Sequence, residues 1–316
     1  MERKTTARAR VKGIFALCSL IFGLVLPPSA AAQDDARWRF DPYGRVEVGF
    51  VSAESGDREE QIVVDGDAVT LRLQAGIDLD SDTTTFQLEA DRIYVDRLGE
   101  GRSSYQRDRF TATLDQELDS DWEIRLQARR YDDFITAEAN DTDETSGLLR
   151  FTYEPERAHR FRLSASWRER EYDPSPENGP DAFATTGRGP RVDAEYRHRL
   201  GRYHYIAADL RAESIASDDA FRRYSRQSAA VSYTRPLNRD LRVRPGVEAI
   251  HTRFGGRTGD DGEVRSDFRI APEVELLWWP GQWRIEAEAK AIFIDSNDER
   301  RDRAGYRLTI AAGYVF

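Results

Sequence analysis

The sequence predicts an all-β protein: a 14-stranded antiparallel up-and-down transmembrane β-barrel with short turns at one rim and long loops at the other. Apolar and polar residues alternate with a period of two over runs of roughly ten residues, the length of a tilted membrane-spanning strand. Short and long connections alternate between these runs, as expected when successive connections lie on opposite rims. Aromatic residues gather near both ends of the runs, which fits two membrane interfaces.

The segment before the first alternating run has the features of an export signal. Residues 13–26 form a continuous apolar run, preceded by five basic residues and followed by the small residues Ser29 to Ala32. This run is too short to cross a bilayer, and its flanks are typical of a cleaved secretory signal. We therefore expect a signal peptide at 1–32, a short N-terminal periplasmic segment at 33–42 and the barrel at 43–316.

Composition excludes several classes of protein. The mean hydropathy is −0.69 and 33% of the residues are charged, which rules out a bundle of membrane helices. Cys18, the single cysteine, lies in the expected signal peptide and follows Leu17, whereas a lipid anchor requires a small residue there. Removal of residues 1–32 takes away five basic residues and one acidic residue, so the formal charge changes from −10 to −14. We expect no nucleic-acid binding, because a polyanion requires a basic surface.

Alternation and turn signals define the first half of the predicted barrel. The expected strands are 43–53, 68–80, 84–96, 104–118, 122–133, 147–153 and 160–172. In the fifth strand, for example, Trp122, Ile124 and Leu126 alternate with polar or charged residues. Short turns near 81–82, 119–121 and 154–159 alternate with long acidic connections near 54–67, 97–103, 132–146 and 173–189.

The second half repeats this pattern. The expected strands are 189–200, 203–213, 224–234, 241–254, 263–278, 283–294 and 303–316. Ile206, Ala208 and Leu210 form the apolar face of 203–213. Short turns near 201–202, 236–239 and 280–281 alternate with loops near 214–220, 256–262 and 295–302. The even number of strands places both termini at the rim of short turns, which we expect to be periplasmic, with the long loops extracellular.

A soluble β-sandwich is the alternative to a membrane barrel. Sandwich strands are shorter, about 5 to 6 residues, and bury their apolar face. Here one face of nearly every strand carries Arg, Glu, Asp or Gln, while the other lacks charge over five or six successive positions. The pattern therefore favours a barrel with an apolar exterior and a polar lumen.

The last strand carries an assembly signal. Residues 306–316 read YRLTIAAGYVF, with apolar residues at alternate positions and the aromatic residues Tyr314 and Phe316 at the end. This stretch resembles the C-terminal strand signature of Gram-negative outer-membrane β-barrel proteins. The resemblance implies a porin-like barrel in the bacterial outer membrane, recognition by the barrel-assembly machinery, and contact with outer-membrane lipids and lipopolysaccharide. Arg226 to Ala249 also resembles the barrel of surface lipoprotein assembly modifiers, whose helical-repeat domain we do not expect in this chain, nor their activity.

The histidines give no catalytic pattern in the sequence. They are His159, His198, His204 and His251. A barrel phospholipase or lipid A deacylase needs a serine two residues from its histidine, and none of the four has one. We therefore interpret them as interfacial residues and expect no catalytic residues, no metal site and no cofactor.

The predicted lumen is strongly basic along four strands. We call the following inward residues of the fifth to eighth strands the basic wall: Arg125, Arg129, Arg150, Arg160, Arg162, Arg168, Arg170, Arg191, Arg197 and Arg199. On the same strands, Glu123, Asp193 and Glu195 are the inward acidic residues, giving ten positive charges to three negative ones. Arginine keeps its charge and binds carboxylates in a planar fork, so the basic wall predicts an anion path.

The opposite side of the lumen contains an acidic cluster, Glu273, Glu275, Glu286 and Glu288. If Pro280 and Gly281 form a two-residue turn, Glu275 faces Glu286 and Glu273 faces Glu288. Like charges in facing positions repel, so basic residues must offset them. The nearest candidates are Arg269, Arg284, Lys290 and Arg307.

These features predict a passive channel for small hydrophilic solutes, anionic ones in particular. The alternative is a non-conducting structural, surface-interaction or export barrel whose lumen is plugged by Arg–Glu pairs. A barrel enzyme is the third possibility. A barrel of ~14 strands lies between the ~8 strands that side chains can fill and the ~16 that leave an open channel. The longest loop, around 173–189, is a candidate constriction.

Overall fold

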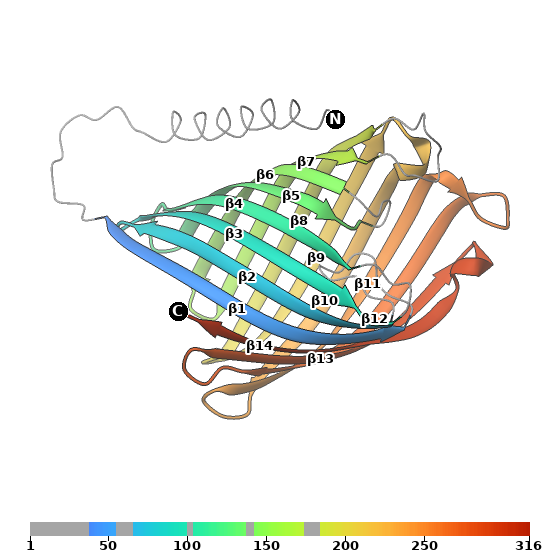
Figure 1. The fold of residues 1–316 in the computed structure, drawn as a ribbon. Helices are drawn as coiled ribbons and strands as arrows, with labels where there is room; N and C mark the ends of the chain where they lie inside the picture. Colours follow the sequence, from blue (N-terminus) through green and yellow to red (C-terminus); the bar gives the residue numbers. More distant parts are fainter. Residues whose placement is uncertain (1–37, 55–65, 100–103, 137–141, 174–183) are drawn as a thin grey trace, which may run out of the picture. The chain divides into compact units, whose positions relative to one another are not determined.

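The structure, a computed structural model, describes residues 38–54, 66–99, 104–136, 142–173 and 184–316. These residues contain fourteen strands and two short 3-10 helices (Figure 1). The strands are β1 (Arg39–Glu54), β2 (Gly66–Asp80), β3 (Thr84–Arg97), β4 (Tyr105–Glu117), β5 (Trp122–Phe134), β6 (Thr142–Glu156), β7 (His159–Tyr172), β8 (Thr185–Gly201), β9 (His204–Ser217), β10 (Tyr224–Pro236), β11 (Leu241–Thr258), β12 (Val264–Trp278), β13 (Trp283–Ser296) and β14 (Arg303–Val315). The 3-10 helices are η2 (Ala220–Arg222) and η3 (Glu299–Arg301).

Each strand pairs antiparallel with its neighbours in the chain, and β1 pairs with β14 to close the barrel. At this seam the backbone N–H of Gly44 donates to the carbonyl of Phe316 at 2.9 Å, and the N–H of Phe316 donates back at 3.0 Å. Closure leaves no unpaired sheet edge, which is the requirement for strands that cross a membrane. The prediction of a fourteen-stranded, up-and-down barrel is confirmed.

Five predicted strand boundaries are wrong by four or five residues, and each of these strands is longer than predicted. β1 begins at Arg39 rather than 43, β6 at Thr142 rather than 147 and β8 at Thr185 rather than 189, while β9 ends at Ser217 rather than 213 and β11 at Thr258 rather than 254. On β6 and β8 the sequence prediction stopped where outward apolar residues stop, but hydrogen bonding between strands continues past the apolar region. Part of the expected segment 33–42 therefore belongs to the barrel.

Some predictions concern residues outside the described ranges. These are the signal peptide at 1–32, residues 33–37 of the N-terminal segment, and residues 174–183 of the candidate constriction loop. Within the described ranges, no helix is both long and apolar enough to cross a membrane.

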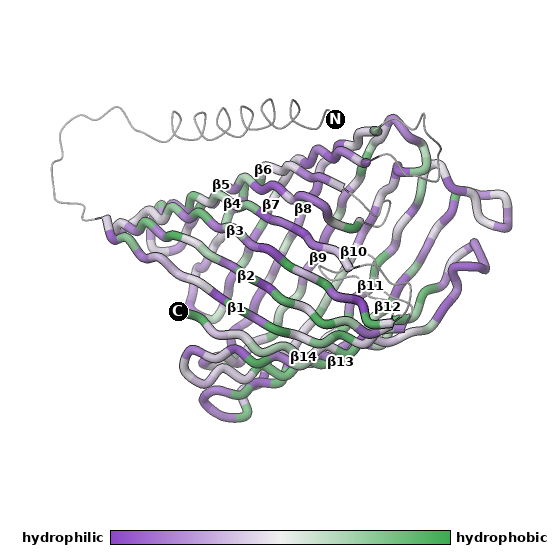
Figure 2. Tube along the Cα trace, viewed as in Figure 1, coloured by the Kyte–Doolittle hydropathy of each residue, from purple (hydrophilic) through white to green (hydrophobic). Residues whose placement is uncertain are grey.

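Hydrophobic and hydrophilic residues alternate along the strands (Figure 2), and the burial pattern of β7 places them on opposite faces of the barrel wall. On β7, Leu163 and Trp167 are 54% and 50% exposed, whereas Ser164 and Arg168 are 3% and 4% exposed. Large apolar side chains thus form the outer surface and polar ones face the lumen. This is the reverse of a soluble sandwich and matches a barrel surrounded by lipid.

Candidate functional site

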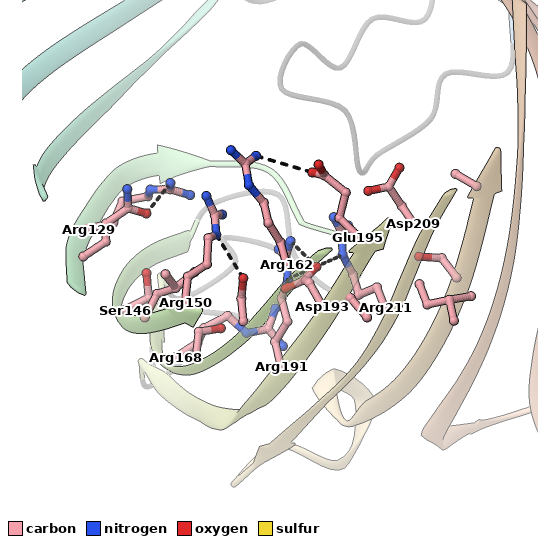
Figure 3. Close-up of a pocket in the computed structure, with 18 of the residues that line it drawn as sticks. Arg129, Ser146, Arg150, Arg162, Arg168, Arg191, Asp193, Glu195, Asp209 and Arg211 are labelled. Atoms are coloured by element: carbon pink, nitrogen blue, oxygen red, sulfur yellow. Dashed lines mark hydrogen bonds and ion pairs between the residues drawn. The ribbon is translucent and has the colours of Figure 1, made fainter. Parts of the chain in front are cut away.

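The lumen contains a cavity of about 430 Å³ beside β5 to β11. Among the described residues, six arginines line it: Arg129, Arg150, Arg162, Arg168, Arg191 and Arg211. Figure 3 shows Arg150, Arg162 and Arg191 projecting from neighbouring strands together with Asp193 and Glu195. The period of two aims these residues into the lumen, and strand pairing brings them together.

The arginines of the basic wall therefore lie on the lumen side as expected, but they differ in the residues that surround them. Five of its ten arginines line the cavity, namely Arg129, Arg150, Arg162, Arg168 and Arg191. Arg125 and Arg170 bond carboxylates next to it, and Arg160 and Arg197 lie against Glu195. Arg199 is exposed near the end of β8, at the rim of short turns.

Glu195 is shared by three guanidinium groups. Its carboxylate lies 2.8 Å from Arg160 and 3.6 Å from both Arg162 and Arg197. Arg160 also lies 3.8 Å from Glu154, so two carboxylates face these three guanidinium groups. This part of the wall therefore keeps a local excess of positive charge.

Arg129 and Arg150 have neutral partners. Arg150 Nε donates to Ser164 Oγ at 3.1 Å. Arg129 donates to Gln127 Oε1 at 2.6 Å, and its guanidinium lies 5.7 Å from the centre of the Tyr131 ring. In the described part of the chain neither arginine forms an ion pair, so both can receive an anion from the lumen.

The predicted count of three inward acidic residues on β5 to β8 is too low, because Glu144 lies on β6, and Asp115 of β4 adds a further carboxylate. Arg125 bonds Asp115 of β4 at 2.5 Å, and Arg170 bonds Glu144 at 2.7 Å. The sequence prediction placed Glu144 in a loop because it started that strand at 147. Asp115 was missed because it belongs to a flanking strand.

A further missed carboxylate, Glu213 of β9, holds a buried network. It accepts from Arg168 at 3.0 Å, from Arg226 at 3.1 Å and from the Tyr224 hydroxyl at 3.0 Å. Its side chain is 4% exposed, and those of the two arginines are 5% and 9% exposed. Arg168 is consequently a structural member of the wall.

β2 to β4 carry a second shared carboxylate that the sequence prediction did not single out. Asp91, 2% exposed, lies 2.5 Å from Arg72, 3.2 Å from Arg107 and 3.7 Å from Arg109. Arg109 also bonds Glu89 at 2.6 Å. The inward alternation of these strands could have revealed the group, but not the convergence of three arginines on one carboxylate.

The predicted register of the acidic cluster is wrong by two residues. Glu275 pairs with Glu288, and Glu273 pairs with Lys290. The turn contains Trp279 to Gln282 rather than two residues. A shift of two preserves which face each side chain occupies, so all four glutamates still point inward.

Each glutamate of the acidic cluster faces a different basic group, and Arg45 is shared between Glu286 and Glu47. Glu273 lies 3.0 Å from Lys290, Glu275 bonds Arg244, Glu286 lies 3.9 Å from Arg45, and Glu288 lies 3.9 Å from Arg307. Lys290 and Arg307 were predicted. Arg244 and Arg45 were not, because the register determines them.

The other two predicted partners are engaged elsewhere. Arg269 donates to Glu248 at 2.5 Å. Arg284 donates to the carbonyls of Gly281 and Trp283 at 2.8 Å. Arg284 is therefore not the basic partner expected for the acidic cluster, whereas Arg269 also interacts electrostatically with Glu273.

The ion pairs between described strands follow the wall. They connect residues of one strand, of adjacent strands, or of strands two apart, as between β7 and β9 and between β1 and β13. Those that face the lumen, such as Arg168–Glu213 and Arg45–Glu286, run along the wall.

Comparison with known proteins gives the fold. No family model matches the sequence, and no curated protein matches it. Solved structures do match. OmpT with loop L8 deleted, an outer membrane protein of Vibrio cholerae, has a TM-score of 0.54 at 10% identity, over 89% of this chain and 100% of that one. OprB of Pseudomonas putida has a TM-score of 0.51 at 8% identity, over 88% and 94%.

A third match, a FadL homologue of Pseudomonas aeruginosa, has a TM-score of 0.50 at 8% identity, over 86% of this chain and 90% of that one. This chain has the outer-membrane β-barrel fold. Its apolar exterior places the barrel in the bacterial outer membrane, with the short turns at the periplasmic rim.

The assembly signal lies at the seam of this outer-membrane barrel. The Phe316 ring lies over Gly44 of β1, where an added Cβ would come within 2.5 Å of it. Tyr314 bonds Gln282 and meets Trp283 edge to face, with ring centres 5.3 Å apart. The terminal aromatic residues therefore join β14 to both neighbouring strands at the periplasmic girdle.

Two histidines of the outer-membrane barrel bond tyrosines near the periplasmic rim. His159 lies 2.9 Å from the Tyr196 hydroxyl, and His204 lies 2.7 Å from the Tyr233 hydroxyl. These contacts fit the interfacial interpretation. The third histidine with a side-chain hydrogen bond, His251, has a serine as its partner.

His251 contacts a serine that sequence spacing could not reveal. Its Nε2 lies 2.8 Å from Ser266 Oγ, across the β11–β12 pair on the outer face. His251 also lines an outer apolar groove of about 440 Å³ with Ala212, Ala249 and Phe268. The sequence search considered serines on the same strand, whereas this contact joins two strands.

Proposed function

We propose that this outer-membrane barrel is a passive channel for small hydrophilic solutes, with a preference for anions. The observation that carries the proposal is the lumen cavity, where Arg129 and Arg150 have neutral partners and Glu195 is shared by three arginines. The ion pairs run along the wall, which supports an open path. No resident cofactor is required for such a channel.

The chemistry of the cavity suits hydrophilic anions. Guanidinium groups bind carboxylate and phosphate in a planar fork, and Ser146, Ser164 and Ser166 add neutral hydrogen-bonding groups. The acidic cluster on the other side has its own bases, so it repels a passing anion less than four free glutamates would.

Planar-bilayer recordings test the proposal. The parent protein is expected to conduct, and its reversal potential in a salt gradient is expected to show anion preference. Replacing Arg129 and Arg150 by Gln should lower that preference, because both unpaired cations are lost. Arg284→Gln is the matched control, since this arginine bonds backbone carbonyls near the turn.

The conductance of the parent separates the channel from the non-conducting barrel. An absence of conductance would replace the channel by the plugged barrel. An unchanged reversal potential in the Arg129→Gln, Arg150→Gln variant would remove the anion site while leaving a channel.

A second candidate function, lipid ester hydrolysis, is favoured by one contact. Ser266 Oγ could attack an ester carbonyl while His251 Nε2 accepts its proton and passes it to the leaving alcohol. Water would then release the fatty acid from the acyl-serine. The outer groove beside His251 has an apolar lining suited to an acyl chain. In the described part of the chain, however, His251 Nδ1 has no partner to orient the ring.

Fluorescent phospholipid in detergent micelles tests this second candidate. Hydrolysis that is lost in Ser266→Ala and retained in Ser225→Ala would support it. Ser225 is the matched control because it lies on the same outer face, two strands away from Ser266. No hydrolysis by the parent protein would leave the channel as the function.

A further inference from the structure

The apolar belt on the outer surface has two different widths. On β13 the outward positions are apolar from Trp283 to Phe293, a span of eleven residues. β12, β14 and β2 carry equal spans, Phe268 to Trp278, Tyr306 to Phe316 and Val69 to Leu79. With a rise of about 3.3 Å per residue and a tilt near 40°, such a span is about 25 Å tall. This matches the usual belt of an outer-membrane barrel.

The belt is narrower from β3 to β10, and on β3 to β8 charged residues lie next to it on the outer face. On β5 it runs from Trp122 to Ala128, and on β7 from Phe161 to Trp167, seven residues each. The next outward residues are Arg130 and Glu169. The same geometry gives a height of about 15 Å. On β3 the outward residue Arg92 follows Ala90 and shortens the belt further.

The charges above the narrow belt bond one another on the outer face. Arg92 donates two hydrogen bonds of 2.6 Å to Asp108. Arg130 bonds Asp132 at 2.7 Å and Asp143 at 2.9 Å. The strand register confirms that Arg130 faces outward, because it pairs with Phe110, whose side chain is 49% exposed on the outer surface. Ion pairs therefore replace apolar side chains at this level.

Both belts start at the same level relative to the periplasmic turns. Trp122 and Trp283 are the first residues of β5 and β13. Arg130 is the eighth residue after Trp122, and Ala291 is the eighth after Trp283. Ala291 still lies within the wide belt, so the difference between the sides is at the outer leaflet.

Tilting the barrel does not remove this difference. A rigid rotation moves both edges of the belt on one side together, so each side keeps its own height. Charged groups at the hydrocarbon level are unfavourable, and a bilayer adjusts to a short apolar span by thinning.

We propose that the β3–β8 face locally thins the outer membrane. The partner that this surface fits is a bilayer whose outer-leaflet headgroups descend to the level of Arg130. On the β12–β2 side the bilayer keeps its ordinary thickness. The barrel thus imposes a step in membrane thickness around its circumference, independently of whether its lumen conducts.

Two single-cysteine variants test the thickness step. Ala128 and Ala289 are outward, half-buried alanines, each the sixth residue after the first tryptophan of its strand. Each is replaced by Cys in the protein reconstituted in dioleoylphosphatidylcholine vesicles, and a nitroxide on it is measured for collisions with oxygen and a water-soluble nickel chelate. The unsubstituted protein gives any background from Cys18.

A thickness step makes the two labels differ. The label at Ala128→Cys should lie about 10 Å closer to the interface, with more nickel collisions and fewer oxygen collisions. Equal depths would overturn the proposal. An immobile label at Ala128→Cys, shielded from both reagents, would show a protein partner on this face and would also overturn it.

A charge-removal variant provides a second measurement. Arg92→Leu with Asp108→Leu removes both members of an outer ion pair and extends the narrow belt. Folding yield in vesicles of increasing acyl-chain length should then peak at longer chains than for the parent. Arg39→Leu with Asp80→Leu, which removes a 3.1 Å pair near the periplasmic rim, is the matched control. A peak that does not move in the Arg92, Asp108 variant would contradict the thinning.

Discussion

Three arginines lie around Glu195 on one side of the lumen, whereas the four glutamates of the acidic cluster on the other side each face a different base. Both sides were built by the same alternation of inward charged residues. They differ in register, because pairing decides how many cations reach each carboxylate. The number of charged residues on a strand is therefore a poor measure of the local electrostatic field. The number of arginines around each carboxylate is a better measure.

The largest effect is expected from a substitution that prevents the barrel from closing, because both sides of the lumen depend on closure. Phe316→Asp should abolish most membrane insertion, because the ring over Gly44 is replaced by a charge at the periplasmic girdle. Heat-modifiable gel mobility measures the folded fraction. Phe316→Trp keeps an aromatic ring and is the control. A normal folded fraction in Phe316→Asp would contradict the assembly role.

The next prediction compares how much one carboxylate on each side of the lumen contributes to the free energy of unfolding. Glu213→Gln should lower the free energy of unfolding by about 3 kcal/mol, because two buried arginines lose their carboxylate. Glu286→Gln should cost less than about 1 kcal/mol, since Glu286 is 40% exposed and 3.9 Å from Arg45. Urea unfolding in vesicles measures both. Equal losses would show that the buried network is no more important than the exposed pair.

A smaller effect on selectivity sharpens the comparison. Glu195→Gln should shift the reversal potential further toward anion preference than Glu286→Gln does. The first variant removes the carboxylate shared by three arginines, whereas the second leaves Arg45 bonded to Glu47. The measurement is the reversal potential of each variant in the same salt gradient. A larger shift in Glu286→Gln would reverse the assignment of the two walls.

The smallest effect is expected in the loops above the acidic-cluster side. The backbone N–H of Glu263 and the Asn297 amide hold the pKa of Asp261 below its usual range. A lowered pKa means that these bonds are intact at neutral pH and are lost as pH falls below about 4. Nitroxides at Gly262→Cys and Arg300→Cys should show a broader distance distribution in acid. Asp261→Asn should reduce this pH dependence, and an acid-independent distance in the parent would refute the contact.

Sequence alone determined the strand number, the closure of an even-stranded barrel, the facing of the charged residues within the predicted strands and the aromatic end of the chain. These features depend on a period of two and on the demand of lipid for apolar side chains, and both are local. The narrow belt above β5 was also present in the sequence, where Arg130 follows Ala128 at the next outward position.

Only the tertiary structure decided which residues meet. The β12–β13 turn has four residues instead of two, so Glu273 gained Lys290 rather than Glu288 as its partner while its facing stayed the same. Glu144 joined the wall because β6 extends past its apolar residues, and His251 met Ser266 because β12 lies beside β11. Facing is repeated every second residue along one strand, whereas contact depends on the relative shift of two strands, which the alternation leaves free.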